Sequence, residues 1–152
     1  MVTLFDEMTA LTKAFDAAGI EYGLCGGLAM AVHGFSRATI DIDFLILADS
    51  LEESYDVAAK LGFDIRGLDM SFKERAVEIR RVSKIDDEGE VLSLDLLLVT
   101  PHVRDVWDSR ITMDLAGNRY SIVSRDGLIK MKTLAGRSQD LADLERLQNE
   151  SN

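Results

Sequence analysis

The chain has 152 residues, which is enough for one domain with a real core but leaves little room for a second. Hydrophobic residues make up 47% of it, with one proline and no low-complexity tract, and this composition excludes a disordered chain. The net charge of −10 argues against broad, non-specific binding to DNA or RNA, because an acidic surface repels phosphate backbones. We therefore expect a single domain over residues 1–152.

Two features of the sequence bear on the compartment. The longest apolar runs are far shorter than a membrane span, and the amino terminus lacks the basic flank and cleavage site of a signal peptide. Cys25 is the single cysteine, so no internal disulfide can form, in agreement with a reducing compartment. The sequence thus predicts a cytoplasmic protein without a membrane partner.

The first part of the chain alternates between helical and extended patterns. Apolar spacing and turn residues predict helices at 3–18, 28–35 and 51–62, and strands at 20–25 and 39–47. The segment 39–47, "TIDIDFLIL", is β-branched at its start and apolar afterwards, which is typical of a strand covered on both faces.

The second part of the chain is richer in strands. The patterns predict strands at 76–85 and 91–99 joined by a turn at 86–90, a hairpin at 111–123 that turns near Gly117 and Asn118, and closing helices at 125–136 and 139–148, capped by Ser124 and Ser138. This order of elements predicts an α/β or α+β domain in which a mixed β-sheet is flanked by α-helices.

Asp41 and Asp43 stand at the head of one of the most apolar segments. Side chains two residues apart on a strand share a face, so the two carboxylates project together and repel each other. A divalent cation removes this repulsion, and Mg²⁺ prefers such oxygen ligands together with substrate phosphates. The D-x-D pattern therefore predicts a metal site, although a solvated pair of aspartates at a strand edge is the simpler alternative.

Asp95 and a glycine pair extend this pattern. Asp95 lies inside "LSLDLLLV", where an unpaired charge is costly, and three carboxylates converge if this strand lies beside the one with Asp41 and Asp43. Such a trio can hold two Mg²⁺ ions, and Asp95 can accept the proton of an attacking hydroxyl. Gly26 and Gly27, at a strand-to-helix junction, let the backbone approach a triphosphate closely.

Taken together, these residues resemble a known family. Gly-Gly, a helix, Asp-apolar-Asp-apolar and a later Asp in an apolar strand look like the nucleotidyltransferase superfamily headed by DNA polymerase beta, with Gly27 and Asp41 separated by 41 − 27 = 14 positions. Within it, "GFSRATIDIDF" and "DGLIKMKTLAGRSQDLADL" look most like the small AbiEii/AbiGii toxin-type nucleotidyltransferases. The resemblance runs from about Tyr22 to Leu147.

The resemblance implies a nucleotidyltransferase-like fold and Mg²⁺-dependent transfer of a nucleoside monophosphate from an NTP, with release of pyrophosphate. By position it assigns the metals and catalysis to three aspartates and the nucleotide to seven further residues: Asp41, Asp43 and Asp95 as catalytic residues and metal ligands, and Gly26, Gly27, Arg37, Thr39, Lys132, Arg137 and Asp140 as nucleotide-binding residues. Among the latter, Asp140 orients the basic side chains.

The acceptor and the partners are left open by the sequence. The leading hypothesis is transfer to an RNA or protein hydroxyl, in a toxin–antitoxin or phage-defence system with a cognate antitoxin or toxin protein. One alternative is a non-catalytic antitoxin or binding partner with the same fold. Another is transfer to a small molecule, which we expect to need a pocket formed by dimerisation. Lys130, Lys132 and Arg137 have a structural alternative as cations near a helix end.

Overall fold

The computed structural model describes residues 3–35 and 41–149 and shows a mixed α+β fold. Its helices in the described ranges are α1 (Leu4–Ala17), α2 (Gly26–Val32), α3 (Leu51–Lys60), α4 (Arg104–Asp108), α5 (Arg125–Ala135) and α6 (Ser138–Asn149). Its strands are β1 (Gly23–Cys25), β2 (Asp41–Ile46), β3 (Ile65–Arg66), β4 (Met70–Phe72), β5 (Val77–Ile85), β6 (Val91–Leu98), β7 (Ile111–Leu115) and β8 (Asn118–Ile122).

The described strands form one mixed sheet in the order β3-β5-β6-β2-β1-β8-β7, and β4 pairs with β5 outside this path. β2 runs parallel to β6, and β1 runs parallel to β8, whereas the other pairs are antiparallel. β2 and β6 are therefore central strands, in agreement with their apolar sequences. The predicted mixed sheet with flanking helices is confirmed.

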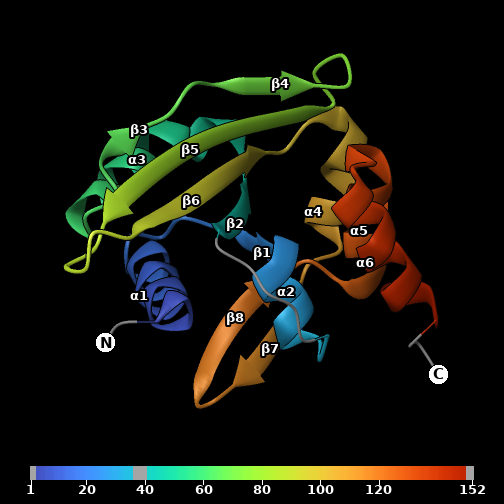
Figure 1. Cartoon of the computed structure of the whole chain (residues 1–152), viewed down its shortest axis with the longest axis horizontal. Coiled ribbons are helices and arrows are strands. Elements are labelled where there is room, and N and C mark those ends of the chain that lie inside the picture. The colour runs from blue at the N-terminus through green and yellow to red at the C-terminus, as the bar shows by residue number, and fades with distance from the viewer. Residues whose placement is uncertain (1–2, 36–40, 150–152) are drawn as a thin grey trace.

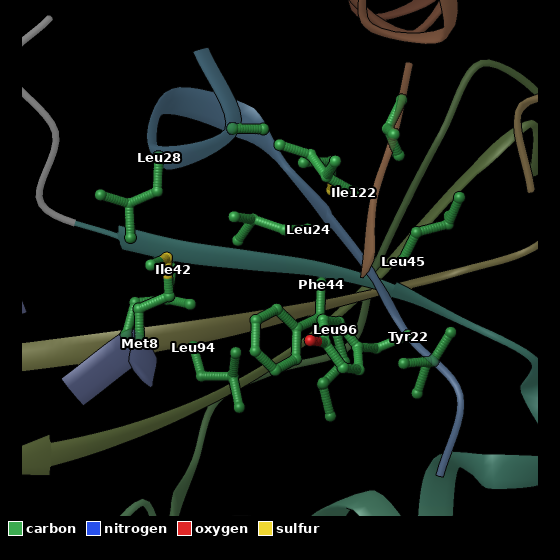
Figure 2. Packing of buried hydrophobic residues seen from close by; sticks show 14 of the residues in the cluster. Met8, Tyr22, Leu24, Leu28, Ile42, Phe44, Leu45, Leu94, Leu96 and Ile122 are labelled. Atoms are coloured by element: carbon green, nitrogen blue, oxygen red, sulfur yellow. The ribbon is translucent and has the colours of Figure 1, made fainter. Parts of the chain in front are cut away.

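The core lies on the face of β2 opposite its aspartates. Ile42 and Phe44 are fully buried there, and Figure 2 shows them among side chains from the neighbouring strands and from α1. The ring of Phe44 stacks on that of Tyr22 at 4.9 Å between centroids and meets that of Phe15 edge-on at 5.1 Å. Burial of this apolar face fixes the register of β2, because a slip by one residue would turn Asp43 into the core.

The helices gather at two ends of the sheet. α1 packs against α3 and β2, whereas α4, α5 and α6 contact one another at the right of Figure 1. A capping box starts α1: Thr3 Oγ1 accepts from the Asp6 amide at 3.1 Å, and Asp6 Oδ2 accepts from the Thr3 amide at 2.9 Å. Ser124 caps α5 as predicted, with its Oγ accepting from the Gly127 amide at 3.1 Å. No described helix is both long and apolar enough to cross a bilayer.

The predicted hairpin of strands 76–85 and 91–99 is confirmed as β5 and β6, and the hairpin 111–123 as β7 and β8. The second hairpin turns one residue earlier than predicted, at Ala116 and Gly117, whose φ angles are 51° and 80°. Two positive φ angles in succession are typical of the tight turns whose twist matches that of paired strands.

Several other boundaries differ from the prediction. The strand predicted at 20–25 is shorter, since only Gly23–Cys25 pair in the sheet, and the next helix begins at Gly26 rather than at 28. Ser138 lies within α6 instead of capping it, since α6 begins at this residue. The carboxylate of Asp140, in the first turn, accepts from the Arg137 amide at 3.2 Å. Ser50 makes no capping hydrogen bond to the described residues, since a short 3₁₀ turn precedes α3.

Candidate active site

A row of residues crosses four neighbouring strands in register. Arg81 of β5 lies opposite Asp95 of β6, Asp95 lies beside Asp43 of β2, and Asp43 lies opposite Cys25 of β1. Residues in register project to the same face of a sheet, and Asp41 shares that face because it lies two positions from Asp43. The structure thus brings together the three aspartates that the sequence singled out, from segments more than 50 residues apart.

Among the described residues, Arg81 is the cation that forms ion pairs with this trio. Its Nε donates to Asp95 Oδ1 at 2.7 Å, and its Nη2 donates to Asp95 Oδ2 at 2.9 Å. The same Nη2 lies 3.4 Å from Asp41 Oδ2. The guanidinium therefore engages both oxygens of the buried Asp95 and reaches toward a second carboxylate. These carboxylates and the resulting hydrogen bond raise the pKa of Arg81, so that it stays charged.

The arginine does not compensate the whole cluster. Burial, followed by the negative charges of Asp95 and Asp41, raises the pKa of Asp43 to about 7, although Lys132 and Arg137 act in the opposite direction. Burial and the charge of Asp95 also raise the pKa of Asp41. Among the described residues of this face, the carboxylates therefore outnumber the cation that contacts them.

Gly26 makes room for Asp43. Its φ of +68° is a backbone conformation that L side chains rarely adopt, and a Cβ at this position would lie 2.0 Å from Asp43 Oδ2. The first glycine of the pair is therefore needed for close contact between the backbone and the carboxylate. Gly27, which follows it in α2, also lines the cleft described below.

The predicted cationic residues form a second charged group on α5 and α6. Lys132 Nζ lies 2.9 Å from Asp143 Oδ2 and 3.4 Å from Asp140 Oδ1, and only 6% of the lysine is exposed. Arg137 Nε donates to Asp140 Oδ2 at 2.7 Å. Burial acts to raise the pKa of Asp140, but the hydrogen bond and charge of Arg137, with the charge of Lys132, hold it below its ordinary value. Asp140 thus contacts both cations.

The two charged groups face a common cleft of about 690 Å³. Its polar end includes the three aspartates, Arg81, Lys132 and Arg137, and its other end has an apolar wall from β4, β5, β6 and α5. This wall consists mainly of Phe72, Val77, Ile79, Leu97, Leu98, Leu128, Met131 and Leu134. The volume lies within the usual range for small-molecule sites. The expectation that a pocket for a small acceptor requires dimerisation is therefore wrong, because one chain forms a cleft of this size.

The remaining predicted positions fall elsewhere. Arg37 and Thr39 lie outside the described residues. Lys130 pairs with Asp105 at 2.7 Å on the surface, away from the cleft, in line with its structural alternative. Cys25 is buried, and burial, followed by the charge of Asp43, raises the pKa of its thiol, which argues against a nucleophile.

The aspartate trio can be tested against the requirements of a divalent cation. Asp41, Asp43 and Asp95 share one face of the sheet and supply only hard oxygen donors, and burial, followed by the charges of Asp95 and Asp41, raises the pKa of Asp43. The type of donor atom in these residues therefore suits Mg²⁺. Among residues 3–35 and 41–149, however, no group of three acidic, His or Cys side chains is already arranged to hold an ion. Arg81 contacts two of the three carboxylates, Asp95 and Asp41.

Sequence reasoning missed three parts of this site. Arg81 stands in "AVEIRRVSKI", and only the pairing of β5 with β6 distinguishes its face from that of Arg80. Asp143, the closest partner of Lys132, follows Asp140 by one helical turn, a spacing that places both on one face of α6. The apolar wall depends on β4, which the sequence did not reveal.

Comparison with known proteins supports the fold. The sequence matches no protein-family model, and no curated protein is similar enough to match it. Among solved structures, it is similar to the lincosamide antibiotic adenylyltransferase LnuA bound to lincomycin, with a TM-score of 0.63, 14% identity and coverage of 97% of each chain.

Two further structures show the same likeness. A predicted nucleotidyltransferase from Thermotoga maritima has a TM-score of 0.62 at 13% identity, over 92% of this chain and 89% of that one. ANT(2'')-Ia in complex with adenylyl-2''-tobramycin has a TM-score of 0.60 at 14% identity, over 94% of this chain and 86% of that one. The chain thus has a nucleotidyltransferase-like fold. The finer resemblance to the AbiEii/AbiGii toxin type stays a prediction.

Proposed function

We propose that this protein is a metal-dependent nucleotidyltransferase that moves a nucleoside monophosphate from an NTP to a hydroxyl acceptor. The observation that carries the proposal is the row of Asp43 and Asp95, with Asp41 on the same face, at the polar end of a cleft that also contains Lys132 and Arg137. The nucleotidyltransferase-like fold supports it together with this site, because a fold alone does not define an activity.

The aspartates have the proposed role of metal ligands. Asp41, Asp43 and Asp95 would hold two Mg²⁺ ions. Bound Mg²⁺ would neutralise phosphate oxygens and stabilise the attacking and leaving oxygens of an in-line displacement. Gly26 keeps the Asp43 carboxylate against the start of α2, where a larger residue would displace it.

The other side chains have proposed roles in binding and proton transfer. Lys132 and Arg137 would face the triphosphate, and Asp140 holds Arg137 in place through its 2.7 Å hydrogen bond. In the transfer step, the acceptor oxygen forms a bond to the α-phosphorus while the bond from that phosphorus to the pyrophosphate oxygen breaks. Asp95 accepts the hydroxyl proton, since its carboxylate has lone pairs beyond those that Arg81 engages.

The proposed acceptor is an RNA or protein hydroxyl, with a role in a toxin–antitoxin or phage-defence system as the wider context. The test is incubation of the protein with each α-³²P-labelled NTP, Mg²⁺ and a cell extract, with Asp41→Ala as the inactive control. We expect labelled RNA or protein with the wild type only. Absence of label with all four nucleotides would contradict the proposal.

The apolar wall of the cleft favours a small-molecule acceptor as a second candidate. Side chains such as Phe72, Leu97 and Met131 provide contact area for an apolar body next to the charged end. LnuA and ANT(2'')-Ia, by their names and bound molecules, act on antibiotics, which agrees with this candidate. The same incubation distinguishes the two acceptors: label that passes a 3 kDa filter, after removal of nucleotides, identifies a small acceptor.

A non-catalytic partner with this fold remains the alternative from another class, and the position of Arg81 favours it, because an internal cation already neutralises part of the cluster. Calorimetry separates the two hypotheses. NTP binding that requires Mg²⁺ supports the enzyme. A metal-independent complex with a co-purified protein, without any NTP binding, supports the partner.

A further inference from the structure

Arg81 stands where a bridging cation between Asp41 and Asp95 would stand. Its Nη2 is shared between Asp95 Oδ2 at 2.9 Å and Asp41 Oδ2 at 3.4 Å, while its Nε takes the second oxygen of Asp95 at 2.7 Å. One guanidinium therefore contacts two of the three carboxylates that are proposed to hold metal.

The neighbouring Arg80, on the same strand, forms ion pairs outside the proposed active site. It faces the other side of β5, where it pairs with Glu78 at 3.2 Å and Asp69 at 3.5 Å, and it does not line the cleft. The two arginines are adjacent in sequence and both form two ion pairs. They differ in that the partners of Arg81 belong to the proposed active site, and this difference makes Arg80 a matched control.

We propose that Arg81 is a built-in counter-ion that competes with the divalent cation for Asp95 and Asp41. The inference rests on the proposed function, since it concerns the metal site of that reaction. Two cations cannot occupy the same space between two carboxylates, and their mutual repulsion is strong in a partly buried site. Binding of the metal thus requires Arg81 to leave at least one carboxylate.

The cleft offers a place for the displaced side chain. Arg81 lines the cleft, and 38% of its side chain is exposed, so the guanidinium can move outward without crossing packed core. At that position it faces the region proposed for the triphosphate. In the metal-free protein, by contrast, its charge offsets the repulsion between Asp95 and Asp41 and keeps the site assembled.

The test compares Mn²⁺ binding to wild type, Arg81→Met, Arg81→Lys and the matched control Arg80→Met, by calorimetry without nucleotide. We expect Arg81→Met to bind Mn²⁺ about tenfold more tightly than wild type, which lies within the usual range of coupling between two sites. Arg80→Met and Arg81→Lys should bind within about twofold of wild type, because each keeps a cation at position 81.

Thermal unfolding in EDTA gives a second readout that does not depend on metal affinity. We expect Arg81→Met to unfold at a lower temperature than wild type in EDTA and to gain more than wild type from added Mn²⁺. If Arg81→Met is too unstable for calorimetry in the absence of metal, Arg81→Gln, which retains hydrogen-bond donors without the charge, replaces it.

The outcomes separate this inference from the proposed function. An Mn²⁺ affinity that is unchanged or weaker in Arg81→Met overturns the proposed competition between Arg81 and the metal. A weaker affinity would identify Arg81 as a positioning residue for Asp95. No Mn²⁺ binding by any variant overturns both the inference and the proposed metal site. Tighter binding in Arg81→Met together with absence of NMP transfer in the wild type would overturn the proposed function and leave the competition in place.

Discussion

The two charged groups of the cleft differ in how well their charges are matched. On α5 and α6, Lys132 is buried between Asp140 and Asp143, and Arg137 is hydrogen-bonded to Asp140. On the sheet, Arg81 contacts two of the three aspartates, Asp41 and Asp95, and the pKa of Asp43 is raised to about 7. Among the described residues, the helix group holds as many cations as acidic side chains, whereas in the sheet group the aspartates outnumber the cation that contacts them.

This difference predicts which of the two groups contributes mainly to stability and which mainly to function. Removal of one member of a matched buried group leaves an uncompensated buried charge, which lowers the free energy of unfolding. An unmatched group is unfavourable for folding and is typical of sites that bind a charged ligand or shift a proton. We therefore expect substitutions in the sheet group to affect transfer, and those in the helix group to affect stability first.

Asp43→Asn should have the largest effect on activity. The substitution keeps the size of the side chain but removes one of the proposed ligands, and loss of several kcal/mol of transition-state stabilisation corresponds to roughly a 10³-fold or greater loss of transfer. The measurement is release of labelled pyrophosphate or incorporation of label. Circular dichroism should show an unchanged fold. Retention of more than a tenth of the wild-type rate would show that Asp43 is not a ligand.

Lys132→Met should have the largest effect on stability. It leaves the buried Asp140 and Asp143 without their shared cation, and loss of one partner of a buried pair lowers the free energy of unfolding by about 3 kcal/mol. Lys130→Met, which removes only an exposed pair with Asp105, is the control and should cost at most about 1 kcal/mol. Urea denaturation measures both. An equal loss of unfolding free energy in Lys132→Met and Lys130→Met would show that the buried ion pairs matter no more for stability than the exposed one.

Gly26→Ala should have an intermediate effect that involves both stability and the site. The positive φ angle and the contact with Asp43 together should cost about 1–3 kcal/mol of unfolding free energy. Gly34→Ala is the control, because its φ is also positive at +97° but no atom of the described residues lies within 4 Å of the added Cβ. A larger loss in Gly26→Ala than in Gly34→Ala, with weaker Mn²⁺ binding only in the former, supports the contact. Equal stability and equal Mn²⁺ binding in the two variants would contradict a role for the contact between Gly26 and Asp43.

The last prediction concerns the pH dependence of stability. The folded pKa of Asp43, about 7, lies above its ordinary value of 3.8, so the folded protein binds the extra proton between these values. In EDTA, the contribution of Asp43 therefore lowers the free energy of unfolding as pH rises from about 4 to about 7, by at most about 1.4 kcal/mol per pH unit. The difference in the free energy of unfolding between wild type and Asp43→Asn, measured by urea denaturation, should show this slope with pH. A difference that does not change with pH would contradict the raised pKa.

The sequence predicted the central elements of the fold well. Long apolar runs in β2 and β6 identified buried strands, and the aspartates inside them suggested a common face, which the parallel pairing of Asp43 with Asp95 bears out in geometry. The helices also carried local signals, such as the capping residues Thr3 and Ser124. These predictions succeeded because burial and capping leave local patterns.

Other features depend on partners far away in the sequence. β3 and β4 are only two and three residues long, and most of their side chains are exposed. They show no alternation of buried and exposed residues, so only their pairing with β5 defines them as strands. Arg80 and Arg81 are equivalent in the sequence until β6 pairs with β5 and sets Arg81 against Asp95.

A crystal structure with Mn²⁺ and a non-hydrolysable NTP analogue tests the central claim most directly. The account predicts anomalous density for the metal between Asp41, Asp43 and Asp95, with Arg81 moved off at least one carboxylate and the triphosphate directed toward Lys132 and Arg137. Nucleotide bound away from the three aspartates, or no metal density among them at saturating Mn²⁺, would contradict it.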